Sequence, residues 1–257
     1  MSNDTPVTPY TTDTPVPVQL ADYAPPPFLI ETVHLDVDIR AGETVVTASL
    51  SCVRNACVDG KQPLVLDGEE LETISVCVDG LRWDPARYRQ SESQLIIENV
   101  PDAFMLETRV RLRPDSNTQL SGFYRSKDGY FTQCEPQGFR RITWFIDRPD
   151  VMARYTVTLH ADKAAFPFLL ANGNPVASGD EPGERHYATW EDPFRKPSYL
   201  FAMVAGKLDV LRDRYRTASG REVQLAIYVE PGKLDQCPHA MLALKKSMRW
   251  DEERFGL

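Results

Sequence analysis

The sequence is poor in the features that mark secreted, membrane-spanning and nucleic-acid-binding proteins. No apolar run approaches the roughly 20 residues that a spanning helix needs. The N-terminus MSNDTPVTPY lacks the basic start and apolar core of a secretory signal. Five cysteines among 257 residues are few and odd in number, which favours a reducing cytoplasm over a disulfide scaffold. Lys and Arg number 29 against 37 Asp and Glu, and this net charge of −8 argues against nucleic acid and anionic membrane as partners.

The motifs of common catalytic and metal sites are also missing from the sequence. No two histidines lie within one helical turn of each other, and neither H-E-x-x-H nor C-x-x-C occurs. There is no G-x-S-x-G nucleophile elbow and no glycine-rich phosphate loop. We therefore expect no catalytic residue and no metal ligand within this chain. The histidines are His34, His160, His186 and His239.

What the sequence does contain is a long series of short strand patterns. Apolar residues occupy alternate positions over 32–39, and after a turn at 41–43 a second alternation runs over 44–53. Similar segments recur further on, each bounded by Gly, Pro, Asp or Asn, and 199–205 is typical of a fully apolar strand. Helical periodicity is almost absent before residue 235. The predicted fold class is all-β, an antiparallel β-sandwich.

The two ends of the chain differ from this pattern. Seven of the 20 prolines fall in the first 27 residues, which predicts a Pro-rich N-terminal extension over 1–27. The β-sandwich domain is expected over 28–206. Over 207–257 the sequence predicts a new hairpin and then the first true helix, which opens at Asp235 or Pro238.

One segment, 130–150, does not fit a plain sandwich. Gln133 and Glu135 stand among aromatic residues, close to two adjacent arginines and an Asp-Arg-Pro-Asp turn. An amide oxygen beside a carboxylate is suited to holding an ammonium group. From the residues alone, a polar turn in which Glu135 pairs with Arg140 or Arg141 remains an open alternative.

The same segment resembles a known signature. The string T-Q-C-E-x-x-G-F-R-R-I-T-x-x-x-D-R-P-D-V over 132–151 is similar to that of the aminopeptidase N family, the zinc-dependent gluzincin aminopeptidases, and most of all to its bacterial alanyl aminopeptidase branch. The resemblance covers about residues 28–257. Four further blocks carry it: LLANGN at 169–174, WEDPFRKP at 190–197, YLFAMVAG at 199–206 and SMRWDEERFG at 247–256.

The resemblance implies a multi-domain enzyme in which a β-rich sandwich or saddle precedes a thermolysin-like catalytic domain. It implies that Gln133 and Glu135 reach into the active site and bind the free α-amino group of a peptide substrate. The family's G-A-M-E-N motif and H-E-x-x-H zinc helix do not occur here. We therefore expect 207–257 to be the first β-hairpin and helix of a truncated catalytic domain.

Further expectations follow from the same resemblance. Zinc would serve the full-length enzyme, whereas the fragment itself would bind none and would be inactive. The expected partners are peptides with a free N-terminus and the remaining domains of the same chain.

Two alternatives stay open. The fold would also allow a non-enzymatic β-sandwich interaction module that binds protein or sugar through its loops. The gene sequence after Leu257 would separate this from an enzyme, since an aminopeptidase must continue into H-E-x-x-H. Within the family, leukotriene-epoxide hydrolases and catalytically dead homologues share the architecture, but the match to the bacterial form argues against both.

Overall fold

The computed structural model describes residues 19–257, so most of the predicted extension over 1–27 lies outside the described residues. Its last part is a short 3-10 turn, η1 (Leu20–Asp22), followed by extended chain. Tyr23 donates a hydrogen bond to Asp150, and the guanidinium of Arg148 donates to the carbonyl of Ala24. The end of the extension is thus tied to the Asp-Arg-Pro-Asp turn.

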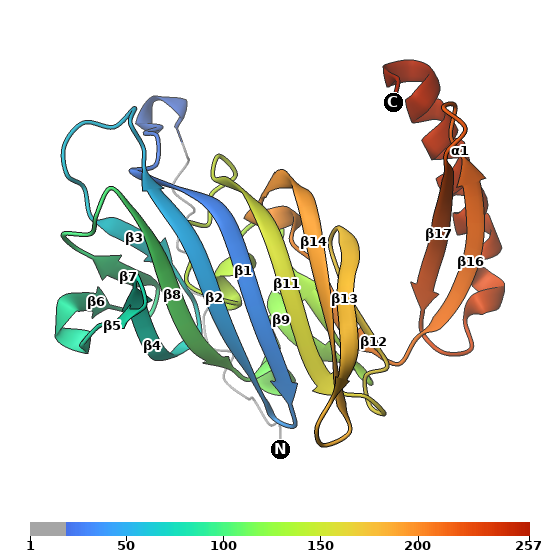
Figure 1. Cartoon of the computed structure of the whole chain (residues 1–257), viewed down its shortest axis with the longest axis horizontal. Coiled ribbons are helices and arrows are strands. Elements are labelled where there is room, and N and C mark those ends of the chain that lie inside the picture. The colour runs from blue at the N-terminus through green and yellow to red at the C-terminus, as the bar shows by residue number, and fades with distance from the viewer. Residues whose placement is uncertain (1–18) are drawn as a thin grey trace, which may run out of the picture.

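An eight-stranded sheet forms one layer of the molecule, in the order β13-β14-β11-β1-β2-β8-β4-β5 (Figure 1). Every neighbouring pair in it is antiparallel except β1 and β11, which run parallel with Val33 opposite Tyr155. Its strands are β1 (Phe28–Arg40), β2 (Glu43–Arg54), β4 (Glu72–Val78), β5 (Leu81–Arg82), β8 (Ala103–Leu112), β11 (Met152–Asp162), β13 (Asn174–Glu181) and β14 (Arg185–Pro197).

Two smaller sheets lie against this one. One has the order β12-β15-β10-β9 and the other β3-β7-β6. Their strands are β9 (Gly122–Ser126), β10 (Gly129–Gln133), β12 (Phe168–Ala171), β15 (Met203–Gly206), β3 (Leu64–Asp67), β6 (Tyr88–Gln90) and β7 (Gln94–Ile97). The 3-10 turns η2 (Pro85–Arg87), η3 (Pro114–Ser116), η4 (Phe139–Arg141) and η5 (Ser198–Leu200) connect these strands.

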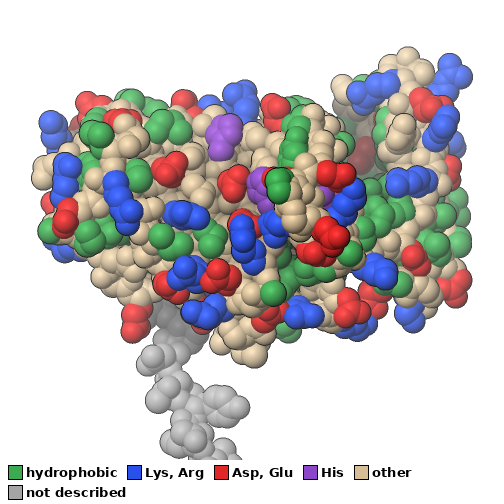
Figure 2. Space-filling model, turned by 60° about the horizontal axis from the view of Figure 1, so that its bottom comes forward, with side chains coloured by type: hydrophobic (Ala, Val, Ile, Leu, Met, Phe, Trp, Pro, Cys, Tyr) green, Lys and Arg blue, Asp and Glu red, His purple; other side chains and the backbone are tan. Residues whose placement is uncertain are grey.

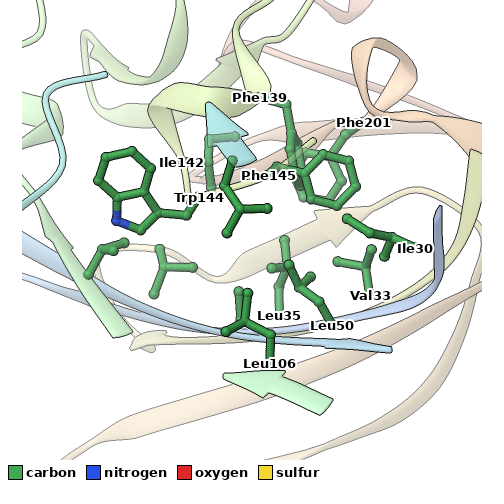
Figure 3. Close-up of a cluster of buried hydrophobic side chains, with 14 of the residues drawn as sticks. Ile30, Val33, Leu35, Leu50, Leu106, Phe139, Ile142, Trp144, Phe145 and Phe201 are labelled. Atoms are coloured by element: carbon green, nitrogen blue, oxygen red, sulfur yellow. The ribbon is translucent and has the colours of Figure 1, made fainter. Parts of the chain in front are cut away.

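The alternation in the sequence places one face of each long strand in the core. In β1 the apolar residues are buried at almost every second position, with one irregularity between Ile30 and Val33. Figure 3 shows Leu35, Leu50 and Leu106 from three neighbouring strands pointing toward side chains of the segment 139–145. The core is therefore continuous from the sheet to that irregular segment. On the face seen in Figure 2, basic and acidic side chains are interspersed.

The all-β class is confirmed, with two departures in detail. The parallel pair β1–β11 makes the large sheet mixed, because alternation along a strand fixes its buried face but not its partner. The predicted apolar strand over 199–205 is wrong in its first half: Ser198–Leu200 is a 3-10 turn, and the strand begins only at Met203. Ser198, at the start of this turn, is buried and donates a hydrogen bond to Asp147, a tertiary contact that the apolar pattern of 199–205 does not encode.

The C-terminal part stands beside the sandwich (Figure 1). It consists of the predicted hairpin, β16 (Asp209–Arg216) with β17 (Glu222–Val229), a 3-10 turn η6 (Leu234–Gln236) and the helix α1 (Pro238–Phe255). The helix opens at Pro238, one of the two predicted starts, where a proline costs no hydrogen bond. None of the helices in the range 19–257 is long and apolar enough to span a membrane.

His160 forms a charged contact across the outer face of the large sheet. Its Nδ1 lies 2.8 Å from Glu181 Oε1 on β13, and its Nε2 lies 3.1 Å from Asp36 Oδ2 on β1. A ring that touches two carboxylates can donate to both only as imidazolium. The hydrogen bond to Asp36 is the main cause that raises the pKa of His160, and Glu181 adds to it.

We expect the stabilising effect of His160 to disappear as the pH rises. Its folded-state pKa lies above the unfolded value of about 6.5, so its contribution is complete below the unfolded value and is lost as the pH passes through the raised one. Urea unfolding should show a larger loss for His160→Gln at about pH 5.5 than at about pH 8.5. His34→Gln, on exposed β1 surface, is the control; an equal loss for His160→Gln at both pH values would contradict the prediction.

Candidate functional site

The candidate site is the turn 134–138 together with Gln133, the last residue of β10. Strand β10 is fixed on both sides, by β9 and by β15, with Phe131 opposite Val204. Just before the turn, the Thr132 hydroxyl donates to the carbonyl of Met203 at 3.2 Å, and the Met203 N–H donates to Thr132 Oγ1 at 2.9 Å. The strand that delivers Gln133 is therefore held by backbone and side-chain bonds.

The turn itself is closed by short backbone contacts. The N–H of Gly138 donates to the carbonyl of Cys134 at 2.7 Å, and the amide Nε2 of Gln133 donates to the carbonyl of Glu135 at 3.0 Å. The peptide bond between Glu135 and Pro136 is cis. These contacts bring Gln133 and Glu135 together on one turn, both with exposed side chains.

Cys134, between the two candidate residues, points the other way. It is 3% exposed and belongs to the hydrophobic core. Burial raises the pKa of its thiol, so it stays protonated at neutral pH and is neither a nucleophile nor a thiolate ligand. The alternation along the chain thus buries the middle residue and presents its two polar neighbours to solvent.

The Glu135 carboxylate has no ion-pair or hydrogen-bond partner within residues 19–257. The alternative in which it pairs with Arg140 or Arg141 is wrong, because both arginines are engaged elsewhere. Arg140 Nε lies 3.0 Å from Asp147 Oδ2. Arg141 pairs with Glu69 at 2.8 Å and with Glu70 at 3.1 Å. Both arginine side chains are therefore occupied by carboxylates other than Glu135.

The aromatic residues after the turn anchor it in the core. Phe139 and Phe145 meet edge to face at 4.8 Å between ring centroids, and Phe139 also meets Phe201 at 5.1 Å. Figure 3 shows these rings, with Trp144 and Ile142, above the side chains of the large sheet. The indole of Trp144 donates to the hydroxyl of Thr73 at 2.9 Å. The segment has no regular strand, yet it is as buried as one.

Side chains that commonly bind metals are not clustered in the described part of the chain. Within it, no group of three or more His, Cys, Asp or Glu side chains is arranged to hold an ion. One surface depression, of about 950 Å³, is lined by residues that include Glu69–Glu72 and Gln90–Ser93. A second, of about 390 Å³, is lined by residues that include Phe131 and Tyr228. Neither is lined by Gln133 or Glu135, which thus lie outside both depressions.

Comparison with known proteins finds a family model and curated relatives that agree with each other. Residues 30–200 match the family model described as the Peptidase M1 N-terminal domain. Aminopeptidase N of Caulobacter vibrioides is 52% identical over 95% of this chain and 28% of its own length. Aminopeptidase N of Escherichia coli is 49% identical over 92% of this chain and 27% of its own. The chain thus spans little more than a quarter of the length of these curated relatives.

Solved structures give the same picture for the fold. Legionella pneumophila aminopeptidase A, in complex with aspartic acid, matches with a TM-score of 0.89 and 35% identity over 93% of this chain and 28% of that chain. An M1 zinc metallopeptidase of Deinococcus radiodurans, bound to a Tyr-Ser-Ala substrate, matches with a TM-score of 0.74 over 89% of this chain and 54% of that chain. At 16% identity, this second likeness shows the fold alone.

The tight turn generates a prediction for Gly138. A Cβ there would lie 2.2 Å from the carbonyl oxygen of Gln133 and 2.9 Å from the Cα of Cys134, both backbone atoms. We expect Gly138→Ala to lower the free energy of unfolding by about 1–3 kcal/mol, as overpacking does elsewhere. Gly206→Ala is the matched control, since its nearest atoms would lie 3.7 Å away. Equal urea midpoints for the two variants would contradict the close approach.

Proposed function

Because this chain belongs to the M1 peptidase family, as its N-terminal domain, we propose that it is the front part of a zinc-dependent aminopeptidase of the alanyl type, which hydrolyses the N-terminal residue from peptides. The resemblance drawn from the string at 132–151 is confirmed by the family match. The observation that carries the proposed role is the exposed Glu135 carboxylate, which lacks a partner among the described residues and stands beside Gln133 on a braced turn.

In this proposal the turn binds the end of the substrate. The N-terminus of a peptide differs from every internal residue by its ammonium group. A carboxylate in a fixed position attracts that charge, and its distance from the reacting centre decides which peptide bond is cleaved. Gln133 would add its amide oxygen as a second acceptor. This is positioning catalysis, in which a small displacement is costly.

Zinc would come from another part of the enzyme. When bound in such an enzyme, it activates the attacking water and polarises the carbonyl. Within residues 19–257 no set of three or more metal-ligating side chains occurs, so the zinc ligands would lie elsewhere in the enzyme. We therefore propose that this chain alone neither holds zinc nor hydrolyses peptides. Metal analysis of the purified chain would test this.

The five cysteines, all unpaired, fit a cytoplasmic location.

We expect substitution of Glu135 in the full-length enzyme to impair recognition of the free amine. Loss of a charge-assisted hydrogen bond in a desolvated site should lower kcat/KM for a free-amine alanyl substrate by about 30- to 1,000-fold. Glu135→Gln keeps the shape and removes the charge, Glu135→Ala removes both, and Gln133→Ala should cost less than either. Glu92→Gln, which changes an exposed carboxylate on another loop, is the matched control.

Steady-state kinetics and thermal unfolding of the same preparations decide the outcome. If Glu135→Gln melts earlier but the folded enzyme turns over its substrate normally, Glu135 serves only the structure of the turn, and the amine-binding role is wrong.

We also propose that the sandwich domain ends near Gly206 and that 207–257 begins the catalytic domain. The tail has a small core of its own, formed by Tyr215, Leu225 and Met241. The ion pair of Lys127 with Glu230 and the edge contact of Phe168 with Tyr228 connect it to the sandwich.

Limited proteolysis of the 257-residue chain tests this boundary. Lys207 is exposed in the connection between β15 and β16, so trypsin should cut there first and leave the sandwich intact. The apolar surface of the tail, which includes Leu242, Trp250 and Phe255, should favour self-association. A tail that resists trypsin in a monomeric sample would contradict the proposal.

A further inference from the structure

A single buried carboxylate connects the two chain segments that flank the candidate site. Asp147 is 3% exposed. Its Oδ2 accepts the backbone N–H of Arg140 at 3.2 Å and the guanidinium Nε of Arg140 at 3.0 Å. Its Oδ1 accepts the hydroxyl of Ser198 at 2.5 Å. Asp147 therefore uses both oxygens on two partners that are 58 positions apart in the sequence.

The first partner belongs to the segment that follows the turn. Arg140 lies in η4 (Phe139–Arg141), which begins one residue after the turn 134–138. The N–H of Arg140 is at the start of this 3-10 turn, where backbone donors lack partners inside the helix. The Asp147 carboxylate accepts this hydrogen bond and thereby holds in place the C-terminal end of the turn that carries Glu135.

The second partner belongs to the segment that supports the turn from its other side. Ser198 opens η5 (Ser198–Leu200), which leads into β15. Strand β15 pairs with β10, and Met203 is bonded to Thr132, the residue before Gln133. Through Ser198, Asp147 is therefore linked to the strand that delivers Gln133.

Stability alone does not account for this arrangement. A buried ion pair contributes little net stability compared with apolar residues of similar volume, because both charges lose their hydration. Unlike an apolar side chain, the carboxylate makes directional contacts. It accepts three hydrogen bonds of fixed geometry from two separate segments. Such bonds set the relative position of those segments.

We propose that Asp147 and Ser198 are positioning residues for amine recognition, which hold the Gln133–Glu135 turn at a fixed place relative to the rest of the active site. This rests on the proposed function, in which Glu135 binds the substrate's α-ammonium group. Neither Asp147 nor Ser198 touches the substrate, because both are buried. They act only through the position of the turn.

A positioning role for Ser198 has a specific kinetic consequence. If Ser198 acts by placing Glu135, its loss should weaken binding of a free-amine substrate, and should matter little once Glu135 has lost its charge. A displacement of about 1 Å at a positioned group can cost about 100-fold. Loss of one of the bonds that define the position should cost about tenfold, mostly in KM.

The test is a double-mutant cycle in the full-length enzyme. The variants are Ser198→Ala, Glu135→Gln and the two combined, assayed with an alanyl chromogenic substrate. We expect Ser198→Ala to lower kcat/KM about tenfold alone and less than about twofold in the Glu135→Gln background. Thr189→Val is the control, because it removes a hydroxyl bonded to Thr158 at 3.0 Å on the large sheet, away from the turn.

Asp147→Asn provides a second arm. The amide can keep one acceptor toward Arg140 and face Ser198 with its NH₂, so shape is retained while the charge is lost. We expect a loss that again vanishes in the Glu135→Gln background. Ser198→Ala, which leaves the buried ion pair of Asp147 with Arg140 in place, decides the matter if Asp147→Asn does not fold.

The outcomes distinguish the two proposals. If Glu135→Gln has normal kcat/KM, the amine-binding role fails and the positioning role fails with it. If Glu135→Gln is impaired but Ser198→Ala equals Thr189→Val, or loses the same factor with and without the Glu135 charge, Ser198 is merely structural. In that case the positioning inference is overturned while the proposed function stands.

Discussion

The constraint on which the rest of this structure depends is the need to cover the inner face of the eight-stranded sheet. Burial of apolar surface is the main source of stability in such a fold. Much of the cover here comes from the irregular segment 139–146, whose Phe139, Ile142, Trp144 and Phe145 are almost completely buried. A loop with this many core side chains cannot move independently of the sheet, because any shift would open voids. The candidate turn is rigid for the same reason, because it is joined directly to this segment at Phe139.

Rigidity and exposure are therefore combined within a few residues. Cys134, the first residue of the turn, and Phe139, just after it, are buried, while Glu135 between them is exposed to solvent. Gly138 permits the close return of the chain, since any side chain would strike the backbone of Gln133. A carboxylate on a mobile loop would lose backbone conformational entropy on binding a cation, whereas the backbone of a packed turn is already fixed by folding.

The sequence predicts the strands well and their partners poorly. Alternation reveals the buried face of β1 and β2, and the turn at 41–43 joins them as a hairpin. The parallel pairing of β1 with β11 connects residues about 120 positions apart, and no local pattern encodes it. Likewise, Gln133 and Glu135 stand out as polar residues among aromatics, but the bond between Asp147 and Ser198 depends on a tertiary contact.

The distribution of charge around the turn explains why Glu135 is left unpaired beside two arginines. Arg140 is neutralised by the buried Asp147 and lies 3.6 Å from Asp67, and Arg141 is shared between Glu69 and Glu70. Side-chain exposures of 16% and 15% show that both guanidiniums are committed to these partners and largely withdrawn from solvent. The four surrounding acids therefore compensate both arginines, so the Glu135 carboxylate is left without an ion-pair partner among residues 19–257.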